Sequence, residues 1–277
     1  MSLKIGIRGH DLPGAPFEKP EDMVEALKLV GIDTLQLVYK KGFKGFKQEA
    51  QFIVELADVL KKNDIKVAMI GAYFNMIHPD LEKRDAGKLY FKWCMETAFL
   101  FETKLVGSET GSANGDKWTF NEYNHTEEAF KIVTDTVKEL NRYGREFKSK
   151  PIIEAAYAHT VYQPSGLKLL IDETEINDVT VDVYNYLNID NYKDADKIFD
   201  ECLELFKDKI RVFHLKDYNV IDGKLVQCAI GDGIMNWEYY IPKIKENCPE
   251  AYLILEGITG EDNIRKSVET VRRIENE

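Results

Sequence analysis

Four short stretches decide the fold of this chain: Ile152-Ile153-Glu154, Val181-Asp182, Val212-Phe213-His214 and Leu253-Ile254-Leu255-Glu256. Each is an apolar run that ends in a potential metal ligand, and the polar ends lie 28, 32 and 42 residues apart. That spacing leaves room for a strand, a helix and two loops. If the runs are neighbouring parallel strands, the three carboxylates and the imidazole meet at one edge of the sheet. Together they would bind a hard or borderline divalent cation.

The rest of the sequence repeats the same alternation of short apolar runs and longer helical segments. Most of the runs are nearly continuously apolar rather than alternating, which indicates parallel strands buried on both faces. Strands are predicted at 3–8, 33–38, 66–71, 104–108, 150–154, 179–183, 210–215 and 251–256. Helices are predicted at 20–31, 47–62, 83–101, 125–147, 164–173, 193–207, 236–247 and 261–275.

Helix start signals support these boundaries. Pro20 precedes two acidic residues, as is typical of a first helical turn. Asn124 followed by Glu127 resembles a capping box. Eight strand–helix alternations without a linker predict a single (β/α)8 barrel domain over residues 1–277. A doubly wound open sheet is the alternative, but no glycine-rich phosphate loop follows the first strand.

Composition restricts the classes of partner. The chain has 277 residues and a formal net charge of −11, from 37 basic and 48 acidic side chains. This charge disfavours nucleic acid and anionic membranes, because both bind mainly through Lys and Arg. Small neutral or weakly charged substrates fit better, and homo-oligomers are compatible with the fold.

The cysteines and the first residues bear on location. The four cysteines are scattered without a C-x-x-C pair, so we expect reduced thiols. Residues 1–10 lack the apolar stretch of a signal peptide, and no apolar run is long enough to cross a bilayer. We therefore expect a cytoplasmic protein.

The sequence resembles the xylose isomerase-like barrels, the sugar isomerase and epimerase group that also includes inosose dehydratases and apurinic endonucleases. The resemblance covers essentially the whole chain. It rests on Glu154, Asp182-Val-Tyr-Asn185, His214-Leu-Lys216-Asp217, Gly231-Asp-Gly233 with Trp237, and Glu256, together with Val106-Gly107-Ser108-Glu109-Thr110 and Asn75 with Pro79-Asp80.

The resemblance implies that Glu154, Asp182, His214 and Glu256 bind one divalent metal ion, most often manganese, magnesium or cobalt, with zinc as an alternative. It also implies that Glu154 and Glu256 act as an acid–base pair on opposite faces of a sugar. A metal that polarises a carbonyl acidifies the neighbouring C–H. One glutamate would remove that proton to give an enediolate, and the other would return a proton.

Further residues are expected at the substrate. Similar epimerases carry a His where this chain has Asn185, and an Arg beyond the histidine ligand where this chain has none. Lys216 would take over a hydroxyl or carboxylate contact, or would pair with Asp217 instead. His159 and Glu109 follow strand ends, and Asn75 lies in an upper loop. We predict substrate contacts for Lys216, His159, Asn185, Glu109 and Asn75.

Three alternatives to a sugar isomerase or epimerase are considered. A dehydratase of an inosose- or dehydroshikimate-like substrate would use the same metal and the same first proton abstraction. DNA repair at abasic sites is disfavoured because the chain has only five histidines and a negative net charge. A non-catalytic sugar-binding barrel would be expected to have lost one of the two glutamates, and both are present.

Overall fold

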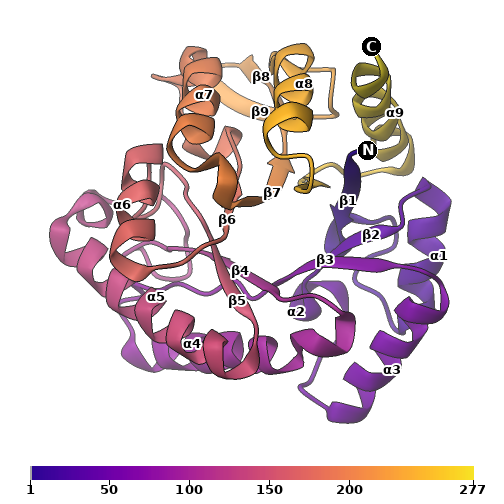
Figure 1. Ribbon diagram of the computed structural model, residues 1–277, viewed down its shortest axis with the longest axis horizontal. Helices are drawn as coiled ribbons and strands as arrows, with labels where there is room; N and C mark the ends of the chain where they lie inside the picture. Colours follow the sequence, from indigo (N-terminus) through magenta and orange to yellow (C-terminus); the bar gives the residue numbers. More distant parts are fainter. Residues whose placement is uncertain (1) are drawn as a thin grey trace. The chain divides into compact units, whose positions relative to one another are not determined.

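The computed structural model describes residues 2–277, and its eight main strands form one closed barrel (Figure 1). Around the barrel the order is β1-β10-β7-β6-β5-β4-β3-β2. The barrel strands are β1 (Lys4–Arg8), β2 (Thr34–Leu37), β3 (Lys66–Gly71), β4 (Leu105–Glu109), β5 (Lys150–Glu154), β6 (Val179–Val181), β7 (Ile210–Leu215) and β10 (Tyr252–Leu255). The predicted (β/α)8 barrel is confirmed, and the open sheet is not formed.

The predicted helices are also present. They are α1 (Pro20–Val30), α3 (Ala50–Lys62), α4 (Leu81–Thr97), α5 (Glu127–Phe147), α6 (Pro164–Thr174), α7 (Ala195–Phe206), α8 (Trp237–Asn247) and α9 (Glu261–Asn276), with a short α2 (Tyr39–Gly42) in addition. The predicted segment 83–101 is divided, because a 3-10 turn over Ala98–Phe101 follows α4.

Helix caps explain where two of these helices begin and end. Pro20 occupies the first turn of α1, and Gly31 ends that helix in the left-handed region at φ 72°. The predicted capping box at Asn124 is wrong. Thr126 caps α5 by accepting a hydrogen bond from the Ala129 amide, while Asn124 belongs to the preceding 3-10 turn.

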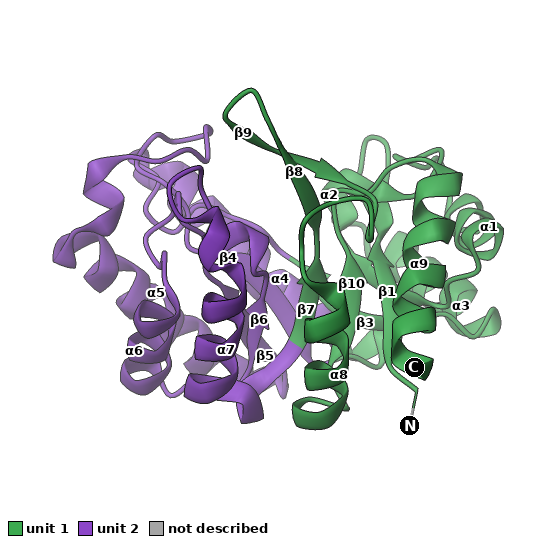
Figure 2. Ribbon diagram, turned by 90° about the horizontal axis from the view of Figure 1, so that it is seen from above, with its two compact units in different colours: residues 1–71, 99–103, 212–277 green, residues 72–98, 104–211 purple. Residues whose placement is uncertain are grey.

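The chain divides into two compact units (Figure 2). Unit 1 comprises Met1–Gly71, Phe99–Thr103 and Val212–Glu277, and unit 2 comprises Ala72–Ala98 and Lys104–Arg211. Within unit 1 both ends of the chain meet, because β1 pairs in parallel with β10. Within unit 2, β4 pairs with β5 and β5 with β6, also in parallel.

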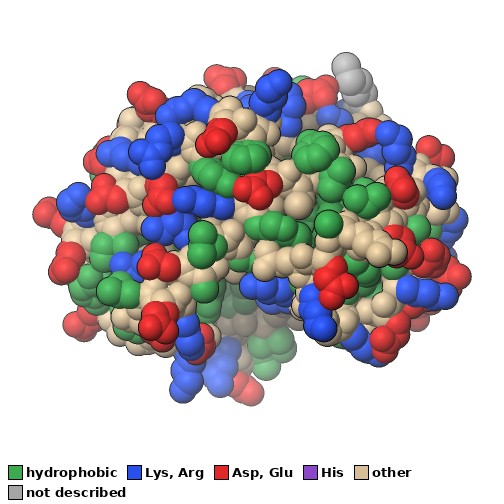
Figure 3. Space-filling view, turned by 90° about the horizontal axis from the view of Figure 1, so that it is seen from below, with side chains coloured by type: hydrophobic (Ala, Val, Ile, Leu, Met, Phe, Trp, Pro, Cys, Tyr) green, Lys and Arg blue, Asp and Glu red, His purple; other side chains and the backbone are tan. Residues whose placement is uncertain are grey.

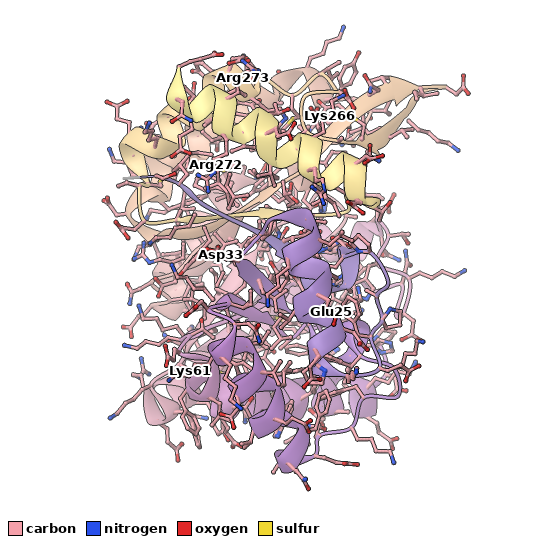
Figure 4. The ribbon with its side chains drawn as sticks, turned by 90° about the vertical axis from the view of Figure 1, so that its right-hand side faces the viewer. Glu25, Asp33, Lys61, Lys266, Arg272 and Arg273 are labelled. Atoms are coloured by element: carbon pink, nitrogen blue, oxygen red, sulfur yellow. The ribbon has the colours of Figure 1, made fainter. Side chains whose placement is uncertain are left out.

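The two chain ends of unit 1 are also fastened by side chains. Glu275 on α9 accepts a hydrogen bond from the Leu3 amide and pairs with Arg272 at 2.7 Å. Arg272 in turn donates to the Leu3 carbonyl at 2.8 Å. Figure 4 shows Arg272 on α9. These contacts hold the last helix against the first strand.

A β-hairpin follows the histidine-bearing strand in unit 1. It consists of β8 (Asp217–Ile221) and β9 (Lys224–Cys228), which pair in antiparallel register. Asp222 and Gly223 form its turn, both with positive φ, at 50° and 70°. An Asp-Gly turn of this kind matches the twist of a two-residue hairpin.

Asp217, at the base of this hairpin, organises the loop that follows it. Its carboxylate is fully buried and accepts hydrogen bonds from five donors. The donors are the amides of Tyr218, Gly231, Gly233 and Met235 and the indole N–H of Trp237. A Cβ on Gly233 would lie 2.0 Å from the Asp217 Oδ1, so only glycine fits. Within the motifs that carry the family resemblance, Asp217, Gly233 and Trp237 therefore have a structural role in this loop.

Replacing Asp217 with alanine is expected to destabilise the protein by about 3 kcal/mol or more, because several buried donors lose their acceptor. Urea unfolding would measure the loss. The matched control is Asp232→Ala in the same loop, which breaks only a half-exposed pair with Lys266 and should cost less than about 1 kcal/mol. Equal effects of the two substitutions would contradict the assignment.

The surface mixes charges of both signs. On the face in Figure 3, acidic and basic side chains are interspersed with apolar ones. Among residues 2–277, no helix combines the length and the hydropathy needed to span a membrane.

Candidate metal centre

The four residues that the sequence singles out lie at strand ends. Glu154 is the last residue of β5, His214 is the penultimate residue of β7, and Asp182 and Glu256 directly follow β6 and β10. All four are buried, with Glu256 the most exposed at 8%. Each offers one potential ligand atom, and these atoms lie within 4.8 Å of one another.

In unit 2, Asn185 connects the two carboxylates that follow β5 and β6. Its side-chain amide donates to Glu154 Oε1 at 2.6 Å, and its backbone amide donates to Asp182 Oδ1 at 3.2 Å. Its backbone carbonyl accepts a hydrogen bond from the backbone amide of Tyr157 at 2.6 Å. Asn185, which is predicted to contact the substrate, thus also fixes the position of the Glu154 side chain.

In unit 1, Glu256 is surrounded by nitrogen atoms. Its Oε1 lies 2.7 Å from Arg8 Nη1 and 2.7 Å from Lys216 Nζ, and its Oε2 lies 2.7 Å from His214 Nδ1. Burial alone would raise the pKa of Glu256, but the charges of Lys216, His214 and Arg8 outweigh it and hold that pKa well below its usual value. Glu256 is therefore an anion at neutral pH.

Arg8 is itself fixed by Asp11. The guanidinium donates twice to the Asp11 carboxylate, from Nε at 2.7 Å and from Nη2 at 3.0 Å. Asp11 Oδ2 also accepts from the backbone amide of Gly257 at 2.8 Å. The Arg8–Asp11 pair thus contacts the segment after β10 twice. Arg8 donates to the Glu256 side chain, and Asp11 accepts from the backbone amide of Gly257. Burial and the Arg8 charge lower the pKa of the neighbouring His10 to about 4.

The other expected substrate residues have defined positions. Lys216 pairs with Glu256. The Asp217 carboxylate, its alternative partner, instead accepts the five hydrogen bonds described above. In unit 2, His159 Nδ1 lies 3.8 Å from Glu109 Oε1, and the Trp118 ring meets the imidazole edge-on at 5.2 Å. His159 is 4% exposed, whereas the Glu109 side chain is 19% exposed, so the pair is partly buried.

Asn75 has a structural role in unit 2. Its side-chain amide donates to the carbonyls of Ser112 and Gly115, and its oxygen accepts from the amides of Ile77 and Ser112. An asparagine side chain offers two donors and two acceptor sites, and all four are used by the backbone. Asn75 thus organises the loops after β3 and β4, and its predicted substrate contact stays a prediction.

Two residues of this centre, Arg8 and Gln36, escape the sequence reasoning. Arg8 and Asp11 support Glu256 from the other end of the chain. Gln36, fully buried in β2, has its side-chain Oε1 2.7 Å from His214 Nε2. The available signal for Gln36 was a polar residue inside the apolar run Leu35-Gln36-Leu37. Arg8 gave a similar signal, because it is a charged residue directly after the apolar part of β1.

A family model and several solved structures match this chain. The family model of the xylose isomerase-like TIM barrel matches residues 24–274. A comparison with curated proteins gave no match.

Solved structures share the fold at low sequence identity. A xylose isomerase-like TIM barrel protein from Mycobacterium smegmatis, solved in complex with magnesium, has a TM-score of 0.77 at 12% identity, covering 99% of this chain and 96% of that one. The 3-keto-D-glucoside 4-epimerase from E. coli has a TM-score of 0.77 at 15% identity, covering 98% and 100%. A probable 3-DHS dehydratase from Bacillus anthracis, involved in petrobactin synthesis, has a TM-score of 0.74 at 12% identity, covering 98% and 99%.

Proposed function

The chain belongs to the xylose isomerase-like TIM barrel family, and we propose that it is a divalent-metal-dependent isomerase or epimerase of a small sugar or polyol. The observation that carries this proposal is the buried group of Glu154, Asp182, His214 and Glu256 with ligand atoms within 4.8 Å. The sugar epimerase among the similar structures supports the reaction class.

The donor set fits a divalent cation. The three carboxylates contribute three negative charges, Lys216 offsets one of them, and Arg8 is already shared with Asp11. Two negative charges then remain in a buried group, which is costly without a counterion. Carboxylate oxygens with one imidazole nitrogen suit manganese, magnesium or cobalt, and zinc is the alternative.

Glu154 is the residue that we assign as the base. A bound cation would polarise a substrate carbonyl and stabilise the negative charge that develops on its oxygen. Glu154 would remove the proton from the adjacent carbon, and the hydrogen bond from Asn185 orients its carboxylate for that step. Return of the proton to the same carbon from the opposite face gives an epimer, and return to the neighbouring carbon gives an isomer.

The two glutamates have different surroundings. Glu154 accepts a hydrogen bond from a neutral amide, whereas Glu256 Oε1 accepts from two cationic side chains. These contacts favour a ligand role for Glu256. The second proton-transfer role that the resemblance implies for Glu256 stays a prediction.

Solvent exchange tests the proposal directly. The Mn²⁺-loaded protein would be incubated in D₂O with a panel of ketoses and inososes, and products would be examined by NMR and mass spectrometry. We expect one non-exchangeable deuterium at the carbon next to the carbonyl of at least one compound. A protein that carries stoichiometric Mn²⁺ but exchanges no proton of any panel member would contradict the proposal.

Metal binding should also stabilise the fold. At a free Mn²⁺ concentration about 100-fold above Kd, linkage adds about 2.7 kcal/mol to the free energy of unfolding. For a chain of this size that corresponds to a rise in Tm of roughly 5–10 °C. Thermal unfolding with Mn²⁺ and with EDTA measures the difference. Asp182→Asn, which removes one ligand charge, should reduce the shift, and an unchanged shift would place the metal elsewhere.

A metal-dependent dehydratase is the second candidate, favoured by the partly buried His159–Glu109 pair. A carboxylate beside an imidazole stabilises its protonated form, which can donate a proton to a departing hydroxyl. Glu109 and Glu154 are register partners on β4 and β5, so the pair lies beside the proposed base. Loss of water from an inosose- or dehydroshikimate-like substrate, detected by mass spectrometry, would favour this reaction over epimerisation.

A further inference from the structure

Gln36 is a buried amide in an otherwise apolar strand. It lies in β2 between Leu35 and Leu37, and all three side chains are fully buried. In the barrel order, β10 and β1 stand between β7 and β2, so the contact between Gln36 and His214 joins strands that are not neighbours. A polar group buried at such a position must have hydrogen-bonding partners. The His214 ring is one of them, at 2.7 Å.

The backbone next to Gln36 is irregular. Leu35 pairs with Val67 but Gln36 pairs with Met69, so one residue of β3, Ala68, has no partner in β2. Thr103 donates its hydroxyl to the carbonyl of Ala68 at 3.0 Å. Bulges of this kind change the direction of side chains and are frequent beside active sites. The register shift falls between Leu35 and Gln36, and Gln36 is the residue that contacts the His214 ring.

The chemistry of the contact determines which ring nitrogen carries the proton. With the Gln36 oxygen facing the ring, His214 Nε2 must donate, because a carbonyl oxygen can only accept. In the neutral imidazole the lone pair is then on Nδ1. That atom lies 2.7 Å from Glu256 Oε2. Two atoms with lone pairs at this distance attract each other only through a shared proton or a shared cation.

We propose that Gln36 is a positioning residue that fixes the Nε2–H tautomer of His214 and so presents Nδ1 to the divalent cation. This inference rests on the metal site of the proposed function. It assigns to β2 a part in metal binding, although β2 contributes no ligand. Partners of this kind raise metal affinity by orienting the ligand and by increasing its basicity.

Two substitutions separate hydrogen bonding from packing. Gln36→Met keeps the length of the side chain but removes the acceptor, and Gln36→Glu keeps an acceptor oxygen. We expect Gln36→Met to weaken Mn²⁺ binding about 10- to 100-fold in calorimetric titration, and Gln36→Glu to bind at least as tightly as wild type. A packing role predicts near-wild-type affinity for both variants, because both keep the size of the side chain. Leu35→Met is the matched control, a similar substitution at the neighbouring residue of the same strand that leaves the contact intact, and its affinity should equal that of wild type.

The tautomer can be observed without any variant. In ¹⁵N-labelled wild-type protein loaded with Mg²⁺, long-range nitrogen–proton spectra should show His214 with its proton on Nε2. A proton on Nδ1 would overturn the inference, and so would wild-type affinity in a folded Gln36→Met protein. Wild-type protein that binds neither Mn²⁺ nor Mg²⁺ would overturn the proposed function and this inference together. Tight wild-type binding with an unaffected Gln36→Met protein would overturn this inference alone.

Discussion

Replacing Glu154 with glutamine is expected to slow deuterium exchange into the substrate by about 10²- to 10⁴-fold, the usual contribution of a general base. Glutamine has nearly the same shape and keeps an oxygen that can accept from Asn185, whose amide lies 2.6 Å from Glu154 Oε1. The fold should therefore be retained while the proton acceptor is lost. The rate would be measured with a panel compound that the wild-type protein exchanges, at saturating Mn²⁺.

Saturating metal is needed because Glu154 is also a proposed ligand. The affinity of the variant for Mn²⁺ would be titrated first, and exchange would be measured at full occupancy. Glu175→Gln is the control, since its side chain in unit 2 is 82% exposed and meets only Arg145 at 4.0 Å. An exchange rate within threefold of wild type in a metal-loaded Glu154→Gln protein would exclude Glu154 as the base.

Much of the barrel could be predicted because its strands are buried on both faces. The runs at 66–71, 150–154 and 210–215 match β3, β5 and β7 to the residue, since each has a largely apolar centre that is typical of a strand buried on both faces. Cap positions were harder. Asn124 and Thr126 are both good capping residues, and only the 3-10 turn formed by Glu122–His125 decides between them.

The ligand set could be predicted for a topological reason. In a parallel barrel the carboxyl ends of strands converge, so Glu154, Asp182, His214 and Glu256 are brought together by the fold alone. The supporting contacts do not follow from that rule. Arg8 and Glu256 are 248 residues apart, and Gln36 and His214 are 178 apart. Nothing local in the sequence indicates which distant partner each of them contacts.

Asn75 and Asn185 illustrate the same limit. Both were expected to contact substrate because of their positions in the motifs that resemble the family. The structure shows Asn75 fully engaged by backbone groups and Asn185 donating to Glu154. A side-chain amide near an active site can bind a ligand or hold the protein together, and its residue type is the same in both cases. Only the list of its hydrogen-bonding partners separates the two roles.

Replacing Glu256 with glutamine is expected to destabilise the metal-free protein by about 3–5 kcal/mol, the usual result of removing one partner from a buried ion pair. The substitution leaves the Arg8 and Lys216 charges, each 2.7 Å from the lost carboxylate oxygen, without that anion. Urea unfolding in EDTA at pH 7 would measure the loss. The matched control is Glu250→Gln, which breaks an exposed pair with Lys4 at 2.6 Å and should cost less than about 1 kcal/mol.

The same ion pairs predict how the effect depends on pH. Because the pKa of Glu256 is held well below its usual value in the folded protein, its charge contributes stability above the pKa of an unfolded glutamate, about 4.3. That contribution is lost as the pH falls from there through the folded value. The difference in unfolding free energy between wild type and Glu256→Gln should therefore be largest near neutral pH and shrink below about pH 4. A difference that is small at pH 7, or that grows as the solution is acidified, would show that Arg8 and Lys216 do not depend on Glu256 for their charge balance.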